Sequence, residues 1–229
     1  MKLSELRESF RSEADDKACA VSPGAKVDVL WSDEEIARFF TEAEAEAAIR
    51  KRLLFDNFTA EVTEIEVEPG VSKYTLDPRL FEVTAAWLYN VGETRRQGLA
   101  ITDLPYLSSE CPYWRGDRSM PERIVIEDSY ILLPNQIIEP WILRLEGYRT
   151  PMNALVNDTD TPEIAEIHHR FLVHWALYRA FKKKDAEVLD PTASATELDA
   201  FEQYFGYRLT ANQGKRNQVD RPHHVRAYW

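Results

Sequence analysis

Cysteine is scarce in this sequence of 229 residues, which contains only two. Cys19 and Cys111 lie far apart, and neither belongs to a C-x-x-C pair. A structural zinc site needs about four ligands, which usually come in closely spaced pairs, so this spacing argues against one. We expect both thiols to stay reduced, either packed in the interior or inert on the surface.

Long apolar runs and common catalytic motifs are also missing. No run approaches the roughly 20 apolar residues that span a bilayer. The charged, amphipathic N-terminus has no apolar core of the kind that a signal peptide needs. We therefore expect no membrane association and a protein that is made and kept in the cytoplasm. The sequence contains no G-x-G-x-x-G, P-loop, G-x-S-x-G or H-E-x-x-H pattern, so these motifs indicate neither nucleotide binding nor hydrolysis.

Charge is plentiful, acidic overall and unevenly distributed. The formal net charge is −11, from 28 basic and 39 acidic residues. The segment from Tyr207 to Trp229 carries five basic residues and one acidic residue, so it is locally positive. An acidic body of this kind disfavours binding to a nucleic-acid backbone over the main surface. The basic tail is suited to an acidic partner.

Three histidines, His168, His169 and His174, lie within seven residues and raise the question of a metal or catalytic centre. On a continuous α-helix His168 and His174 lie roughly 120° apart and His169 and His174 roughly 140° apart, so neither pair can bind one ion. Glu166 and His169 match the Glu-x-x-His unit of di-iron bundles, but no second copy follows. We expect no metal, no cofactor and no catalytic residue. A metal-dependent hydrolase using the three histidines is the less favoured alternative.

The same segment is better explained as a core helix. Its apolar residues follow the helical period of about 3.6 residues. They are Ile164, Ile167, Phe171, Leu172, Trp175 and Tyr178. The histidines then lie at the edge of the core or at an interface.

Apolar residues at spacings of three and four predict two helices before the middle of the chain. The first covers residues 3–20. The second begins at Ser32 and extends to about residue 54, and Ser32 and Glu35 have the spacing of a capping box.

Two further helices are predicted after the middle of the chain. One should run from Thr161, acting as N-cap, to about Asp185. The last should begin either at Asp190, with Pro191 in the first helical position, or at Ser194.

The middle of the chain, residues 58–150, alternates apolar and polar residues and predicts a β-rich block. We place Val62, Ile65 and Val67 in its first strand. Later strands are expected at KYTL, LFEVTAAWLY, GLAITDL, ERIVIED, YILLP and WILRLEGYR. Because the intervening turns are too short for helical crossovers, we expect antiparallel connections.

The order of these elements predicts an α+β fold. The N- and C-terminal helices should form one helical bundle, with the antiparallel β-rich block inserted at one end. We expect a single domain over residues 1–213, with helices in 1–57 and 160–213, followed by an extended basic C-terminal arm over 214–229.

Aromatic residues gather in the least regular part of the β-rich block. Tyr106, Tyr113 and Trp114 lie there, next to Arg115. Aromatic side chains on irregular loops often anchor protein contacts, so these residues are candidates for partner binding. Packing down onto the β-rich block is an equally good interpretation.

Several linked segments resemble the head–tail adaptor, or connector, proteins of tailed bacteriophages. Leu30–Asp56 resembles the early helix of that family, with its W-S-D-E-E opening, and Thr63–Leu88 resembles the first strands, with a Y-T-L-D-P turn. Thr161–Phe181 resembles the family's P-E-I helix, with H-x-x-L-V-x-W-A-L further along it, and FEQYFGYRL follows in the last helix. Together these segments cover about half of the chain in the family's order.

The resemblance implies a structural virion protein without enzymatic activity. Such adaptors form a ring, typically of about twelve copies, beneath the portal, where they extend the DNA channel and dock the tail. The implied partners are the portal protein, a tail-side protein, further copies of the chain, and double-stranded DNA that passes without specific binding. The implied location is the virion neck, reached from the host cytoplasm during assembly. Another neck component, such as a stopper or tail-completion protein, is the alternative within the same class.

By its position in the resemblance, the C-terminal arm is expected to bind the portal. The residues assigned to this contact are Lys215, Arg216, Arg221, His223, His224, Arg226, Tyr228 and Trp229.

Overall fold

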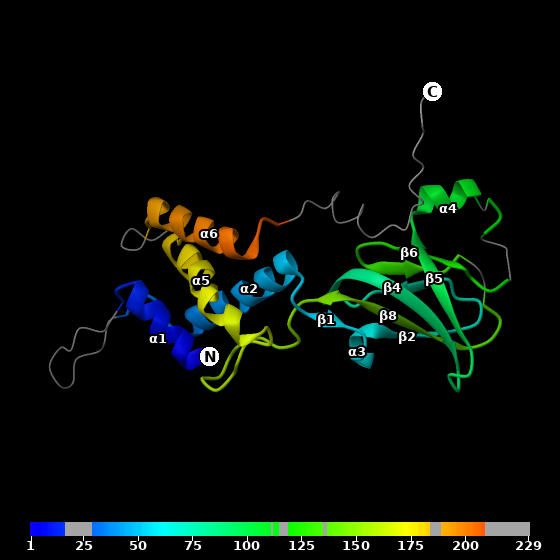
Figure 1. Ribbon diagram of the computed structural model, residues 1–229, viewed down its shortest axis with the longest axis horizontal. Helices are drawn as coiled ribbons and strands as arrows, with labels where there is room; N and C mark the ends of the chain where they lie inside the picture. The colour runs from blue at the N-terminus through cyan, green and yellow to red at the C-terminus, as the bar shows by residue number, and fades with distance from the viewer. Residues whose placement is uncertain (17–28, 111, 115–118, 135–136, 184–188, 209–229) are drawn as a thin grey trace, which may run out of the picture. The chain divides into compact units, whose positions relative to one another are not determined.

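The chain contains helices and one curled, mixed sheet, so the fold is α+β, as predicted (Figure 1). The computed structural model describes residues 1–16, 29–110, 112–114, 119–134, 137–183 and 189–208. These residues form two compact units. The helical unit comprises Met1–Leu54 and Thr150–Arg208, and the β unit comprises Phe55–Arg149. The single-domain boundaries and the C-terminal arm stay predictions, and the arm lies outside the described residues.

The helical unit is built around one hydrophobic core. Its elements are α1 (Leu3–Glu13), α2 (Asp33–Lys51), the 3₁₀ helix η1 (Glu166–Phe171), α5 (Leu172–Phe181) and α6 (Pro191–Phe205). Helix α5 lies against α1, α2 and α6. The core includes Phe10, Trp31, Phe40, Phe201 and Phe205, all fully or almost fully buried. Each large buried side chain stabilises the fold by about 1.5–3 kcal/mol.

The N-termini of α2 and α6 form as their sequences predict. The Ser32 hydroxyl accepts a hydrogen bond from the Glu35 N–H at 3.2 Å, and the Glu35 carboxylate accepts one from the Ser32 N–H at 3.3 Å, which completes the capping box. The Asp190 carboxylate caps α6 by accepting hydrogen bonds from two backbone N–H groups. Starting α6 at Ser194 was therefore wrong, and the Ser194 hydroxyl instead donates to the Tyr178 carbonyl.

Two predicted helices are shorter than expected. Helix α1 ends at Glu13 rather than near residue 20, because Asp15 adopts a left-handed backbone conformation with φ of 53°. The segment from Thr161 is not helical until Glu166, and it begins there as a 3₁₀ helix. The N-cap role of Thr161 was thus wrong. The buried Glu44 carboxylate instead holds the backbone of this segment.

Within the described residues, the β unit is a single sheet of eight strands. The strands are β1 (Phe55–Asp56), β2 (Glu64–Val67), β3 (Lys73–Thr75), β4 (Leu80–Asn90), β5 (Arg96–Thr102), β6 (Arg123–Ile126), β7 (Tyr130–Leu132) and β8 (Trp141–Arg149). Their order is β1-β8-β4-β5-β6-β7-β3, and β2 pairs with β8 beside β1. Strands β4 and β8 pair along their full lengths.

The sheet has to curl, because its two ends are joined by a short turn. Strand β2 lies at one edge and β3 at the other, and only residues 68–72 connect them. Five extended residues reach at most about 18 Å. The Tyr74 hydroxyl donates to the Val71 carbonyl at 2.9 Å and the Leu133 N–H donates to the Ser72 carbonyl at 2.8 Å. These bonds hold the connecting turn in place.

The prediction of antiparallel connections was wrong at one position. Strands β5 and β6 are parallel, and the connection between them contains helix α4 (Leu104–Glu110). Parallel neighbours need a crossover of a dozen or more residues, and this connection is long enough to supply one. The first predicted strand was also too long. Val62 lies in the short helix α3 (Ala60–Thr63), and β2 begins only at Glu64.

Candidate partner-binding surfaces

The three clustered histidines turn toward different partners. Nδ1 of His168 lies 3.0 Å from the Tyr204 hydroxyl, and Nδ1 of His174 lies 2.7 Å from a carboxylate oxygen of Glu197. His169 is buried, and its Nε2 lies 2.8 Å from the Ile164 carbonyl, to which it must donate because a carbonyl only accepts. Each ring therefore has its own partner, which lies on α6 for His168 and His174 and in the segment before η1 for His169.

The helical angles predicted for these histidines were wrong in detail. His168 and His169 lie on the 3₁₀ helix, which has about 3.0 residues per turn, and only His174 lies on the α-helix. Within the described ranges, no group of three or more His, Cys, Asp and Glu side chains is arranged to hold a metal ion. Cys19 and Cys111 lie outside the described residues.

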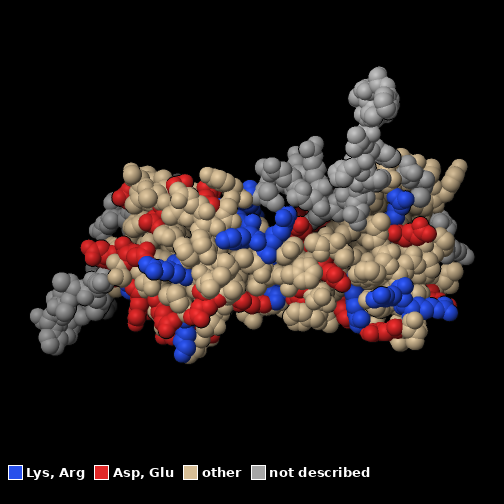
Figure 2. All heavy atoms as spheres, viewed as in Figure 1, with Lys and Arg blue, Asp and Glu red and all other residues tan. Residues whose placement is uncertain are grey.

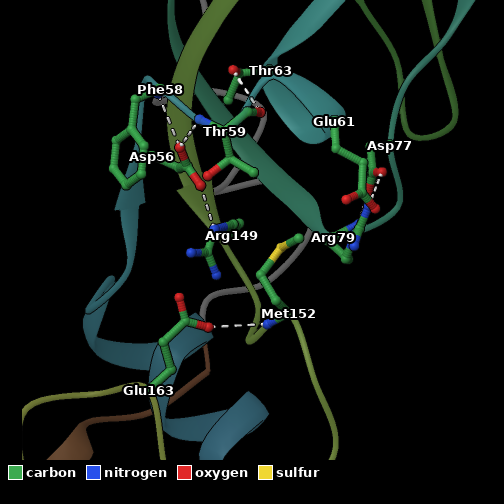
Figure 3. Close-up of polar contacts among 10 residues, drawn as sticks. All are labelled: Asp56, Phe58, Thr59, Glu61, Thr63, Asp77, Arg79, Arg149, Met152 and Glu163. Carbon is green, nitrogen blue, oxygen red and sulfur yellow. Dashed lines mark hydrogen bonds and ion pairs between the residues drawn. The ribbon is translucent and has the colours of Figure 1, made fainter.

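A buried carboxylate explains why the backbone after Thr161 is not helical. Glu44 on α2 is only 1% exposed, and its carboxylate accepts hydrogen bonds from the N–H groups of Glu163 and Ile164. Burial raises the pKa of Glu44 to about 7, although the two hydrogen bonds lower it. The Glu163 carboxylate accepts a hydrogen bond from the Met152 N–H at 3.0 Å (Figure 3). The segment before η1 is thus held by side chains rather than by helical hydrogen bonds.

A buried ion pair fastens β1 to the end of β8 in the β unit (Figure 3). Asp56 is fully buried, and one carboxylate oxygen accepts a hydrogen bond from Nε of Arg149 at 2.5 Å. The other oxygen accepts bonds from the N–H groups of Phe58 at 3.1 Å and Thr59 at 2.9 Å. Burial alone would raise the pKa of Asp56, but Arg149 and these donors lower it to about 2.

The turn that Asp56 organises presents an exposed aromatic side chain. Phe58 is 78% exposed, and Figure 3 shows its side chain on the turn beside Asp56. Phe55, the residue directly before Asp56, is half exposed and contacts Tyr148 edge to face, with 5.4 Å between the ring centres. Rigid, exposed aromatic side chains are typical anchors of protein interfaces.

The aromatic residues predicted as a binding loop have different surroundings. Trp114 is 6% exposed and packs with Leu107 and Val125. Tyr106 lies on α4 under the Arg123 guanidinium, 5.4 Å from its ring centre. Tyr113 is 87% exposed. Trp114 therefore packs onto the β unit, Tyr113 faces solvent, and a role of these residues in partner binding stays a prediction.

The remaining predicted site residues lie outside the described part of the chain. They are Arg115 of the loop and the arm residues Lys215, Arg216, Arg221, His223, His224, Arg226, Tyr228 and Trp229. Their assignment to partner binding stays a prediction.

The β unit also has a groove of about 720 Å³ that the sequence pattern did not predict. Ile137 and Trp141 form buried parts of its wall, and the wall also includes Ile138, which is 68% exposed. Arg95 and Arg96 line the same groove and are exposed. These residues are far apart in the sequence, so only the folded sheet brings them together. The one sequence signal that could have indicated this groove is the pair of adjacent arginines, Arg95 and Arg96, in a strongly acidic chain.

The exterior mixes charges of both signs with an acidic excess. Figure 2 shows acidic and basic side chains interspersed on the visible face. Many cations are bound to carboxylates, as in the pair of Arg50 with Glu202 at 3.0 Å and that of Arg79 with Asp77 at 2.7 Å. In the described part of the chain, no helix is long and apolar enough to cross a membrane.

An α+β scaffold with a mixed apolar and charged groove and an exposed aromatic side chain on a hydrogen-bonded turn has the features of a protein that acts through contacts with other proteins. The family model described as SU10 adaptor protein matches residues 1–226. The chain therefore belongs to this family, a family of bacteriophage head–tail adaptors, as its segments suggested. The family is structural and generally non-enzymatic. No individual curated protein matches the sequence.

Proposed function

We propose that the chain is a head-to-tail adaptor that assembles as a ring beneath the portal of a DNA-filled head. In this position it extends the channel through which the genome leaves and offers a docking surface for the tail. The observation that carries the proposal is the family match over residues 1–226. The partners are the portal protein on one side, a tail-side protein on the other, and about twelve copies of the chain in one ring.

The acidic exterior supports passage of DNA through such a ring. The net charge of −11 opposes binding of a polyanion, because like charges repel at close range. Double-stranded DNA can then slide through the lumen without specific contacts. The basic segment at the C-terminal end is the exception, and we assign it to the portal rather than to DNA.

The test uses purified protein, isolated portal and DNA-filled heads. Electron microscopy and native mass spectrometry should show one ring of copies bound to each portal, and purified virions should contain the protein at the neck. A protein that binds neither portal nor heads, and that is absent from virions, would contradict the proposal.

A further inference from the structure

We infer that the groove receives Phe58 of a second copy of the chain, and that this contact, repeated from copy to copy, joins the ring. The inference rests on the proposed function and adds to it which two surfaces of neighbouring copies are in contact. It is carried by one juxtaposition: a groove lined by apolar side chains and two exposed arginines lies at one end of strand β8, and an exposed aromatic side chain lies at the other.

The groove combines an apolar wall with polar and charged side chains, a mixture typical of protein interfaces. Ile137 and Trp141 give it an apolar wall, and Ile138 leaves 68% of its surface in water. An exposed isoleucine beside buried apolar groups gains free energy when another apolar side chain covers it. The groove volume of about 720 Å³ has room for an aromatic side chain together with its turn.

Two arginines give the groove a preference for aromatic and acidic groups. Among the described residues, neither Arg95 nor Arg96 pairs with a carboxylate, although Glu139 lines the same groove. Arg96 already lies over the Trp87 ring, 5.7 Å from its centre. Guanidinium groups bind aromatic faces and carboxylates, and a second copy of a chain with net charge −11 supplies both.

Phe58 has the properties of the side chain that fills such a groove. It is 78% exposed, and its backbone N–H is held by the fully buried Asp56 carboxylate. A side chain on a turn that is already ordered loses little conformational entropy on binding.

The placement of the two surfaces favours a head-to-tail contact over a two-fold one. Trp141 in the groove begins β8, whereas Asp56, which holds Phe58, pairs with Gly147 near the end of β8. Six residue steps of extended strand separate Trp141 from Gly147, about 20 Å. When two different surfaces meet in this way, each copy keeps one of each free for the next neighbours, and the series closes when the rotation allows a ring.

Disulfide cross-linking of the assembled ring tests the contact. The two native cysteines are first replaced by serine (Cys19→Ser and Cys111→Ser). Phe58→Cys and Ile138→Cys are then introduced together in this background. The protein is assembled on DNA-filled heads, oxidised, and analysed on a non-reducing gel. The double variant should give a ladder of covalent multimers, because every neighbouring pair is linked. Each single variant should give monomers.

Binding strength gives a second measurement on the same assembly. Phe58→Ala should lower the number of copies bound per head at limiting protein by at least about tenfold, as expected for loss of an interface anchor. Val156→Ala, an exposed aliphatic residue of the other unit, is the matched control and should bind as the unaltered protein does. Thermal unfolding confirms that both variants are folded.

The outcomes separate this inference from the proposed function. If unaltered protein fails to bind heads, the proposed function fails. If it binds but the double variant gives no ladder, the inference is wrong. Dimers from Phe58→Cys alone would show a two-fold contact and overturn it as well. If Phe58→Ala forms a ring with the normal number of copies but cannot join tails, the inference is also wrong, and Phe58 contacts a tail protein instead.

Discussion

At the scale of single residues, two buried carboxylates have pKa values shifted in opposite directions. Glu44 accepts hydrogen bonds only from neutral backbone N–H groups, so burial dominates and its pKa rises to about 7. Asp56 is buried as well, but the Arg149 guanidinium and two N–H groups outweigh burial and lower its pKa to about 2. The sign of each pKa shift therefore depends on whether the carboxylate has a charged donor beside it, as Asp56 has, or only neutral ones, as Glu44 has.

Asp56→Asn should destabilise the β unit strongly. The change removes a negative charge beside a buried guanidinium, a loss that typically costs about 3–5 kcal/mol. The free energy of unfolding, measured with urea at pH 7, should fall by that amount. Glu61→Gln is the control, since its ion pair with Arg79 is exposed to solvent and should contribute little to stability.

The acid side of the stability profile should also depend on Asp56. Its folded pKa of about 2 lies below the ordinary value of 3.8, so its contribution is present above pH 3.8 and is lost as the pH falls toward 2. The difference in unfolding free energy between the unaltered protein and Asp56→Asn should shrink over that window. A constant difference would contradict the assignment.

Glu44→Gln should make the stability of the protein less dependent on pH between about 4.5 and 7. The folded pKa of Glu44, about 7, lies above the ordinary value of 4.5, so its protonated form stabilises the fold and that contribution is lost as the pH rises from 4.5 through 7. Relative to Glu44→Gln, the unaltered protein should lose on the order of 3 kcal/mol over this window. Urea unfolding at a series of pH values measures the difference. Glu34→Gln, an exposed neighbour on the same helix, should leave the profile unchanged.

At the scale of elements, the pairing of β4 with β8 depends on a glycine. The register between these strands shifts between Val83 and Ala85, which brings the backbone of β4 close to Gly147. A Cβ atom on Gly147 would lie 2.1 Å from the Glu82 carbonyl oxygen and 2.9 Å from Cα of Val83. Both neighbours are backbone atoms, so the strand itself would have to move.

Gly147→Ala should therefore destabilise the β unit by about 3 kcal/mol, at the upper end of the usual cost of overpacking. Gly98→Ala is a suitable control. Its Cβ would meet only the Trp87 side chain, at 3.1 Å, and a side chain can shift. Urea unfolding of both variants compares the two costs; equal losses would mean that the close backbone approach is not what requires Gly147.

At the scale of the whole molecule, the proposed contacts lie on separate parts of the chain. The groove and Phe58 belong to the β unit, and the predicted portal contact belongs to the C-terminal arm. Contacts that depend on separate segments can be removed one at a time. Loss of the groove contact should then weaken head binding by removing the contacts between copies, whereas loss of the arm should remove portal binding itself.

Deletion of residues 215–229 should abolish binding to isolated portal while leaving the protein folded. The deletion removes Lys215, Arg216, Arg221 and Arg226, the cations assigned to the portal contact. Pull-down with purified portal measures binding, and circular dichroism confirms the fold. A variant with the same four residues changed to Ala at full length is the matched comparison, and unchanged portal binding of the truncated chain would refute the assignment.

The sequence by itself determined the class of fold and the start of helix α2, and it offered the correct start of α6 as one of two. The Ser32 capping box and the Asp190 cap depend on residues three positions apart or fewer; the first formed as predicted, and the second is one of the two starts predicted for α6. Alternating apolar residues placed β4 and β8, because the period of a strand is visible without its partners. The family resemblance rested on such local segments, and the match over residues 1–226 confirmed it.

Only the tertiary structure decided the features that depend on distant residues. The segment after Thr161 looked helical, but Glu44, more than a hundred positions earlier, holds its backbone N–H groups. The parallel pair of β5 and β6 and the groove beside Ile138 also arise where the curled sheet brings separated segments together. Local hydrogen-bonding patterns can be recognised from neighbouring residues, whereas burial and long-range partners are set only when the whole chain has packed.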